Sequence, residues 1–344
     1  MNISLYLSPF ITSFLASVVL IAATIWLCGK FNGLISKRKS SRHVSGKRIS
    51  RLGGVAIILS FSLAIFLDPN LFISQSLWGI LIACGLILVV GLWDDFRELD
   101  WKTQLFFQVA VAVFVFIMGV RVEYITNPFG GVLFLNLGKY LLPSLFFVIG
   151  WLVLLMNSAN WLDGVDGLSG GISLIGSLTI FFLSLKPEVN QPPVGIIAAA
   201  LAGALAGFLL FNFHPAKILA GTAGSMFMGF ILAVLAVFAG TKIATALLIM
   251  TIPIIDALWV IGERLRAGTS IFRPDQRHLH FKLVELGWSQ RKITLFFYGV
   301  ISAIALVALN TRAIGKMITI ILVLLITVAV LIFVNRKLKA AKTA

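Results

Sequence analysis

Two amides and two carboxylates recur at three-residue spacing in segment 157–168. Asn157, Asn160, Asp163 and Asp166 follow a long apolar run, and a glycine comes directly after each aspartate. A carboxylate within hydrocarbon costs at least a few kcal/mol, so acids at the edge of a membrane span indicate a functional site. The alternative is a polar loop, but a loop alone requires neither the regular spacing nor both glycines.

An adjacent acid pair, Asp94 and Asp95, stands at the end of another apolar run. Neighbouring carboxylates repel each other unless a divalent cation, a shared proton or a nearby base is present. Mg²⁺ in particular binds through one or two carboxylates together with substrate phosphates. The pair is therefore a candidate for metal and phosphate chemistry, with a solvated acidic loop as the alternative.

Two further segments combine cations or amides with glycines. Segment 42–54 carries Lys47 and Arg51 and ends in two glycines, which allow the backbone to approach a phosphate ligand closely. A basic loop is equally an ordinary signal of membrane topology. Segment 211–225 contains a turn between glycines just before a helix start, whose amides either face an anion or form a simple interhelical connection.

A histidine pair occupies the longest polar connection, at 273–282. His278 and His280 are two residues apart among several cations, and no third His or Cys is close in the sequence. A zinc site is therefore not indicated. The pair favours phosphate binding or proton transfer, with a solvated loop as the alternative.

Membrane-spanning helices must position these polar clusters. The chain has 344 residues, of which 59% are hydrophobic and 12% charged, with a mean hydropathy of +1.03, far outside the range of soluble globular proteins. Apolar windows of about 17 to 22 residues predict about eleven spans. The windows are 8–28, 52–67, 75–93, 103–120, 140–158, 168–185, 193–211, 224–240, 243–261, 293–309 and 316–334. We predict an all-α, polytopic membrane protein with a single domain over 1–344.

The distribution of basic residues predicts the orientation. The basic loop 30–51 follows the first span, so this span is expected to be a retained helix with its N-terminus outside. Eleven spans then place the C-terminus in the cytoplasm, together with most of the 28 Lys and Arg residues and every polar cluster described above. The net charge of +15 mainly reflects this topology, and we expect no nucleic-acid partner. Cys28 and Cys84 lie in or at the ends of apolar spans, so no disulfide framework or thiolate metal site is expected.

Taken together and in this order, the clusters resemble the polyprenyl-phosphate N-acetylhexosamine-1-phosphate transferase superfamily, glycosyltransferase family 4. The resemblance extends over about 42–292 and depends most on the string Asn-x-x-Asn-x-x-Asp-Gly-x-Asp-Gly-Leu at 157–168. The Arg-Leu-Gly-Gly sequence at 51–54 and the His-Leu-His sequence at 278–280 look more like the branch that uses UDP-N-acetylglucosamine than the phospho-N-acetylmuramoyl-pentapeptide branch.

The resemblance implies a transferase of the cell inner (cytoplasmic) membrane with two substrates, a lipid and a nucleotide sugar. The phosphate of undecaprenyl or another polyprenyl phosphate would attack the β-phosphorus of a cytosolic UDP-sugar and release UMP. The sugar would most often be N-acetylglucosamine, and the reaction would be the first membrane step of a cell-envelope glycan pathway. Mg²⁺, with Mn²⁺ as a substitute, is the implied cofactor, and a homodimer is expected by analogy.

The same resemblance assigns roles to individual residues. Catalytic roles fall to Asp94, Asp95, Asp163, Asp166, His278 and His280. Among these, Asp94 or Asp95 would deprotonate or position the lipid phosphate, and Asp163 and Asp166 would lie at the nucleotide end. Substrate binding falls to Lys47, Arg51, Lys102, Asn157, Asn160, Asn212 and Arg277. Asp95 and Asp166 would bind the metal.

The chain departs from the family pattern most strongly at Thr222, where the family carries an aspartate that binds Mg²⁺. Phe281 also replaces a frequent histidine, Ser50 a frequent proline, and Gln104 a frequent lysine. Three alternatives therefore remain open: an active N-acetylglucosamine-1-phosphate transferase, a catalytically impaired homologue that binds lipid phosphate or nucleotide sugar, and an enzyme similar to the pentapeptide transferases. An ion-coupled transporter would require polar residues near the middle of spans and an internal repeat, and the sequence indicates neither.

Overall fold

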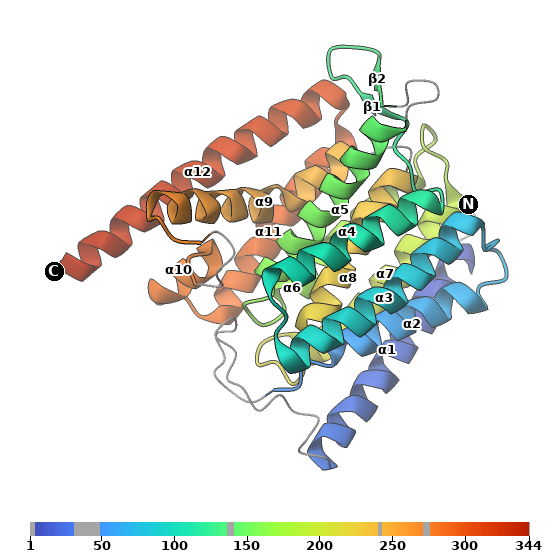
Figure 1. The fold of residues 1–344 in the computed structure, drawn as a ribbon, viewed down its shortest axis with the longest axis horizontal. Helices are drawn as coiled ribbons and strands as arrows, with labels where there is room; N and C mark the ends of the chain where they lie inside the picture. Colours follow the sequence, from blue (N-terminus) through green and yellow to red (C-terminus); the bar gives the residue numbers. More distant parts are fainter. Residues whose placement is uncertain (1–3, 31–48, 136–140, 240–242, 271–275, 344) are drawn as a thin grey trace.

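The computed structural model describes residues 4–30, 49–135, 141–239, 243–270 and 276–343. These residues form twelve α-helices and one two-stranded hairpin (Figure 1). The helices are α1 Ser4–Lys30, α2 Gly53–Leu67, α3 Gln75–Arg97, α4 Trp101–Ile117, α5 Leu142–Leu162, α6 Leu168–Ser184, α7 Pro192–Asn212, α8 Gly221–Phe238, α9 Ile243–Arg266, α10 Leu279–Glu285, α11 Gln290–Asn310 and α12 Ala313–Thr343, and the strands are β1 Tyr124–Thr126 and β2 Val132–Phe134. Each predicted apolar window coincides with one helix, and α10 is the additional one.

Helix length separates two groups among the apolar helices. Eight of the described helices are long and apolar enough to cross a membrane. The helices α2, α4 and α6 are apolar but have only 15, 17 and 17 residues. At 1.5 Å per residue they measure about 22 to 26 Å, against a hydrocarbon core about 30 Å thick. The architecture is that of a polytopic membrane protein, while the count of eleven spans and the orientation stay predictions.

A short β-hairpin between α4 and α5 departs from the all-α prediction. Strand β1 pairs antiparallel with β2, and Tyr124 lies opposite Phe134. The turn contains Gly130 and Gly131, both with positive φ, a conformation that glycine adopts without steric penalty. Periodicity over three residues is too short to predict such strands. The hairpin lies at the end of the bundle opposite α10 (Figure 1).

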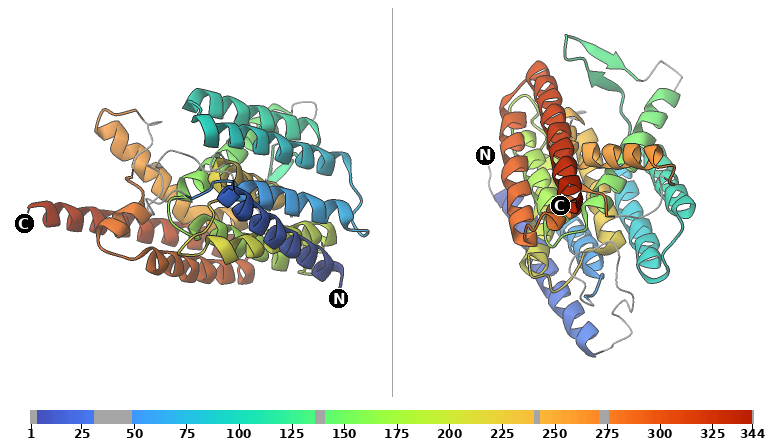
Figure 2. Two further views of the ribbon diagram at one scale, coloured as in Figure 1. Left: turned by 90° about the horizontal axis from the view of Figure 1, so that it is seen from below. Right: turned by 90° about the vertical axis from the view of Figure 1, so that its left-hand side faces the viewer.

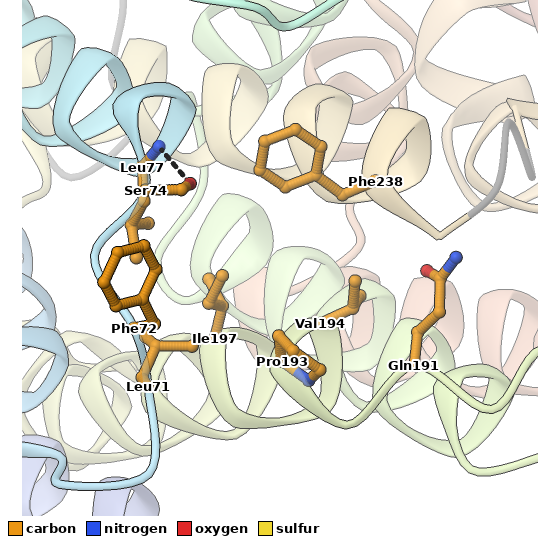
Figure 3. Close-up of a pocket in the computed structure, with 9 residues that line it drawn as sticks. All are labelled: Leu71, Phe72, Ser74, Leu77, Gln191, Pro193, Val194, Ile197 and Phe238. Atoms are coloured by element: carbon orange, nitrogen blue, oxygen red, sulfur yellow. Dashed lines mark hydrogen bonds between the residues drawn. The ribbon is translucent and has the colours of Figure 1, made fainter.

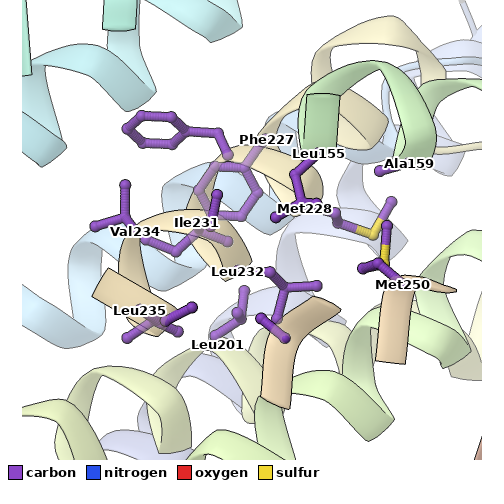
Figure 4. Close-up of a cluster of buried hydrophobic side chains, with 14 of the residues drawn as sticks. Leu155, Ala159, Leu201, Phe227, Met228, Ile231, Leu232, Val234, Leu235 and Met250 are labelled. Carbon is purple, nitrogen blue, oxygen red and sulfur yellow. The ribbon is translucent and has the colours of Figure 1, made fainter. Parts of the chain in front are cut away.

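Helix α8 forms the centre of the bundle. In its 18-residue apolar window, 94% of the helix is buried, whereas the corresponding share is 17% in α1 and 17% in α12. It packs against α2, α3, α5, α6, α7 and α9. Phe227 and Ile231 of α8 lie in a buried cluster with Leu155 of α5, Leu201 of α7 and Met250 of α9 (Figure 4). Its burial and these contacts make α8 the helix against which the others pack.

Glycines allow the helices to approach each other closely. A Cβ on Gly54 of α2 would lie 2.3 Å from the backbone nitrogen of Gly224 in α8, and a Cβ on Gly203 of α7 would lie 2.2 Å from the carbonyl oxygen of Phe10 in α1. Membrane helices associate largely through such packing of small residues, because lipid gives no hydrophobic drive for association. The first contact holds α2 against the start of α8, where the polar segments meet, and the second holds α7 against α1.

The peripheral helices present apolar side chains outward. Val19 of α1 and Phe333 of α12 are each 65% exposed. The C-terminal part of α12 extends beyond the rest of the bundle (Figure 2). Exposed apolar surface of this extent is expected where lipid surrounds the protein.

Candidate functional site

Polar segments that are far apart in the sequence meet at one end of the helix bundle. The backbone N–H groups of Gly53 and Gly54 donate to the carbonyl oxygens of Leu219 and Ala220 at 3.0 and 2.9 Å, and the N–H of Leu219 donates to the carbonyl oxygen of Ser50 at 2.8 Å. The segment before α2 therefore runs beside the segment before α8. The glycines at 53 and 54 serve this close approach of two backbone segments, since a Cβ at either position would collide with the 219–224 segment.

Asp94 lies in the last turn of α3 and is 2% exposed. Its Oδ1 accepts hydrogen bonds from the backbone N–H of Leu99 at 2.8 Å and from Nε2 of Gln104 at 2.6 Å. Its Oδ2 accepts from the hydroxyl of Thr222 at 2.6 Å. Both carboxylate oxygens thus receive hydrogen bonds from neutral groups of the protein.

Asp95 is 6% exposed and interacts with the first turn of α8. Its Oδ1 accepts from the N–H of Thr222 at 3.0 Å and lies 3.7 Å from a guanidinium nitrogen of Arg51, and its Oδ2 accepts from the N–H of Ala223 at 3.4 Å. Helix N-termini leave their first amides without intrahelical partners and carry partial positive charge. Gly221 has φ +69°, and a Cβ there would lie 2.5 Å from Oδ2 of Asp95. The acid therefore caps α8 and is stabilised by it.

The described side chains do not fit the Mg²⁺ site that the family resemblance implies. Among the ranges that the structure describes, no group of three or more His, Cys, Asp or Glu side chains is placed to hold a metal ion. The hydroxyl of Thr222 donates to Asp94 and so serves as a hydrogen-bond donor at the position where a metal ligand was expected. Asp95 bonds to the start of α8, whereas Asp166, the other expected ligand, bonds to His214.

The two asparagines of segment 157–168 face different helices. Asn157 in α5 exchanges two side-chain hydrogen bonds with Gln108 in α4, with donor–acceptor distances of 2.7 and 3.3 Å. The carboxamide oxygen of Asn160 accepts from the hydroxyl of Ser225 in α8 at 2.8 Å. Both residues connect the end of α5 to neighbouring helices.

The two aspartates of the segment lie in the turn between α5 and α6. Asp163 accepts from the hydroxyl of Ser169 at 2.5 Å. Asp166 is 1% exposed, and its Oδ2 lies 2.7 Å from Nδ1 of His214 and accepts from the N–H of Ala216 at 3.1 Å. The acidic turn is thereby joined to the segment between α7 and α8, as the family resemblance would require of two parts of one site.

Asn212 and helix α11 support this acidic turn. The side chain of Asn212 accepts from the N–H of Gly167 at 3.0 Å and donates to the carbonyl oxygen of Ile218 at 2.8 Å. From α11, Tyr298 donates to the carbonyl oxygen of Gly167 at 2.5 Å, and Thr294 donates to that of Asp166 at 2.9 Å. Gly167 has φ +76° at the start of α6, a conformation that favours glycine.

The two histidines lie against the acidic turn. Nδ1 of His278 is 2.9 Å from Oδ2 of Asp256 in α9, and the ring of His278 stacks on Trp161 with centroids 6.2 Å apart. The ring of His280 lies parallel to that of His278, with centroids 5.8 Å apart. A Cβ on Gly164 would lie 2.4 Å from Nε2 of His280, so only a glycine accommodates the ring at this distance.

Three predicted substrate-binding residues carry positive charge: Lys47, Lys102 and Arg277. Lys102 is exposed in the first turn of α4, and Arg277 is half-buried just before α10. Asp100 caps α4, where hydrogen bonds from Thr103 lower the pKa of the Asp100 carboxyl. Lys47 lies outside the described residues.

Sequence reasoning missed three polar residues in or beside the site. Asp256 lies just past the middle of the long apolar helix α9, and the cost of an acid there could have identified it. Gln108 is similarly buried in the apolar helix α4. His214 belongs to a predicted cluster but received no role of its own, because only the fold places it 2.7 Å from Asp166.

An apolar cavity of about 250 Å³ lies near the first turns of α3 and α7, at the ends of these helices that are far from the polar cluster (Figure 3). Its lining residues are Leu71, Phe72, Ser74, Leu77, Gln191, Pro193, Val194, Ile197 and Phe238. None of these residues is an acid or a base, and the hydroxyl oxygen of Ser74 already accepts from the N–H of Leu77 at 3.3 Å. This cavity is therefore separate from the polar cluster and offers no group for phosphate chemistry.

The chain is similar to known proteins over most of its length. A family model described as Glycosyl transferase family 4 matches residues 77–240. A decaprenyl-phosphate N-acetylglucosaminephosphotransferase of Mycobacterium leprae is 32% identical over 315 residues, which cover 83% of this chain and 78% of that protein. A probable undecaprenyl-phosphate N-acetylglucosaminyl 1-phosphate transferase of Bacillus subtilis is 30% identical over 315 residues, covering 87% and 85%. A phospho-N-acetylmuramoyl-pentapeptide-transferase of Listeria monocytogenes is 28% identical over 321 residues, covering 87% and 96%.

Proposed function

The chain belongs to glycosyl transferase family 4, a family of multi-pass bacterial membrane phosphoglycosyltransferases, and we propose that it transfers N-acetylglucosamine 1-phosphate from UDP-N-acetylglucosamine to a polyprenyl phosphate. The observation that carries this proposal is the convergence of the acid pair, the acidic turn and the histidines at one end of the bundle. The choice of N-acetylglucosamine follows the names of the 32% and 30% identical relatives. The product would be the first membrane-bound intermediate of a cell-envelope glycan pathway.

The proposed reaction exchanges one phosphorus–oxygen bond for another. An oxygen of the lipid phosphate bonds to the β-phosphorus of the nucleotide sugar, while the bond from that phosphorus to the oxygen shared with the α-phosphate breaks and UMP leaves. Phosphoryl transfer depends mainly on positioning and on neutralising charge. Arg51, His278 and His280 are the groups that we assign to the phosphates. We assign Asp94 or Asp95 to accepting the proton of the lipid phosphate.

Three parts of the proposal come from the family resemblance alone. Mg²⁺, or Mn²⁺ in its place, would neutralise phosphate charge when bound. Because the described side chains do not fit a preformed metal site, we assign no step to the metal. The roles of Lys102, Asn157 and Asn160 in substrate binding and the homodimer also remain predictions.

A second candidate function is binding without turnover. The hydroxyl of Thr222 donates to Asp94, and the amides of α8 bond to Asp95, so the protein itself satisfies the acid pair. A catalytically impaired homologue would then bind lipid phosphate or nucleotide sugar through the cation and histidines that we assign to the phosphates, without using the acid pair. The pentapeptide-transferase relative, at 28% identity, gives a third candidate with a different sugar donor.

Release of UMP by the purified protein in detergent tests the proposal. The donors to compare, each with and without undecaprenyl phosphate, are UDP-N-acetylglucosamine, UDP-N-acetylgalactosamine and UDP-N-acetylmuramoyl-pentapeptide. We expect lipid-dependent release from UDP-N-acetylglucosamine, its loss in Asp94→Asn, and its retention in Glu188→Gln, which changes an exposed acid outside the site. Release from the pentapeptide donor alone would favour the third candidate. Donor binding without release would favour the second, and neither binding nor release would contradict all three.

A further inference from the structure

Thr222 and Gln104 together complete the environment of the acid pair. Thr222 donates its hydroxyl to Oδ2 of Asp94 and its backbone N–H to Oδ1 of Asp95, so one residue serves both acids. Gln104 donates to the other oxygen of Asp94 at 2.6 Å. Hydrogen bonds of this kind to an ionised carboxylate are stronger than bonds between neutral groups.

The two residues also balance each other in charge. The family resemblance gives an acid at position 222 and a lysine at position 104, and this chain has a neutral hydrogen-bond donor at both. Exchanging one acid and one base for two neutral groups leaves the net charge around Asp94 unchanged. Both donors reach the same carboxylate, one from α4 and one from α8. The two departures from the family pattern therefore act on a single group.

A divalent cation at the acid pair would compete with these interactions for the lone pairs of the carboxylate oxygens. Mg²⁺ requires near-octahedral oxygen ligands and loses its water reluctantly. Binding to Asp95 would compete with the amides of Thr222 and Ala223, which start α8, and with the guanidinium of Arg51 at 3.7 Å. Displaced amides at a buried helix start would lack partners.

We propose that hydrogen bonds from Thr222 and Gln104 stabilise the Asp94–Asp95 pair in this chain, in place of a divalent cation. Threonine at position 222, where the family resemblance gives an aspartate, is the residue that determines whether the pair binds a cation. The substitution Thr222→Asp would place a third carboxylate within hydrogen-bonding distance of Asp94 and remove the hydroxyl donor. Three carboxylates at such distances repel each other and favour a cation between them. The proposal concerns the acid pair itself and does not depend on whether the proposed function is correct.

Titration with Mn²⁺, followed by electron paramagnetic resonance of the free ion, tests this without substrates and without turnover. The variants of the full chain are wild type, Thr222→Asp and Thr222→Asn, the last matching aspartate in shape without its charge. We expect Thr222→Asp to bind one Mn²⁺ per chain at least tenfold more tightly than the other two, and Mg²⁺ to displace it. Adding Asp95→Asn to Thr222→Asp should abolish the binding.

A double variant, Gln104→Lys with Thr222→Asp, keeps the test decisive if the single variant fails to fold, because it restores the charge balance. Stoichiometric Mn²⁺ binding by wild type that Asp95→Asn removes would overturn the proposal, as would failure of both aspartate variants to gain binding. If wild type releases no UMP, the proposed function fails while the Mn²⁺ titration still decides this inference.

Discussion

Asp256 is the residue whose substitution most sharply tests how the site is held together. Its carboxylate is 6% exposed, with Oδ2 placed 2.9 Å from Nδ1 of His278 and Oδ1 accepting from the N–H of Leu279 at 2.8 Å. The acid thus fixes both the imidazole ring and the start of α10. The variant Asp256→Asn keeps the shape of the side chain but replaces one acceptor oxygen by an NH₂ donor. Either the hydrogen bond from Leu279 is lost, or the NH₂ faces Nδ1 of His278 and forces the imidazole into the opposite tautomer.

The size of the expected effect follows from the interaction lost. A hydrogen bond to a charged group contributes about 1.5 to 3 kcal/mol. Since about 1.36 kcal/mol corresponds to a tenfold change in rate, kcat/KM should fall about 10- to 150-fold if the loss acts fully through His278. Loss of the interaction with Leu279 instead would appear mainly as a lower melting temperature.

The assay is UMP release by Asp256→Asn, His278→Ala and the double variant. If Asp256 acts through His278, the double variant should be no slower than His278→Ala alone, because coupled residues are not additive. Glu263→Gln is the matched control, since Glu263 lies on the same helix but bonds to Lys282 and Asn335. Wild-type kcat/KM together with an unchanged melting temperature in Asp256→Asn, or losses that multiply in the double variant, would refute the reasoning.

Three further predictions concern packing, topology and the acidic turn. Gly54→Ala should lower the melting temperature in detergent, because the new Cβ would lie 2.3 Å from the backbone of α8. Gly85→Ala should leave the melting temperature unchanged, because a Cβ there meets no atom within 4 Å. Equal melting temperatures of the two variants would contradict this reasoning. In a cysteine-free background, a cysteine at Lys102 should react with impermeant reagents only from the cytoplasmic side and one at Arg312 only from outside, and the reverse pattern would contradict the predicted orientation. Asp166→Asn should lower UMP release at least tenfold by weakening its 2.7 Å contact with a histidine, and unchanged release would contradict that role.

Hydropathy predicted the helices well because membrane thickness fixes how long an apolar run must be. The windows 224–240 and 243–261, for example, became α8 and α9. The windows could not show that α8 lies at the centre, since an apolar helix surrounded by protein and one surrounded by lipid have similar compositions. Chain contacts decide that difference, and glycines such as Gly54 and Gly224 contribute to it.

Motif spacing identified the residues of the candidate site better than their partners. Segment 157–168 and the histidine pair were both predicted from residue type, and the structure places Gly164 directly against His280. The partners of Asp94 depend on how α3, α4 and α8 are rotated against each other, which residue types do not determine. The position of Thr222 was recognised as a departure from the family pattern, but only the fold shows its hydroxyl donating to Asp94.

The fate of the β-phosphorus tests the central claim most directly. The purified chain would be given UDP-N-acetylglucosamine labelled at that phosphorus, together with undecaprenyl phosphate in detergent, and the lipid would then be extracted. Transfer of a sugar 1-phosphate predicts that the label enters the lipid fraction, that UMP appears in equal amount, and that both are lost in Asp94→Asn. Label that stays in water as UDP, or equal transfer by Asp94→Asn, would contradict the account.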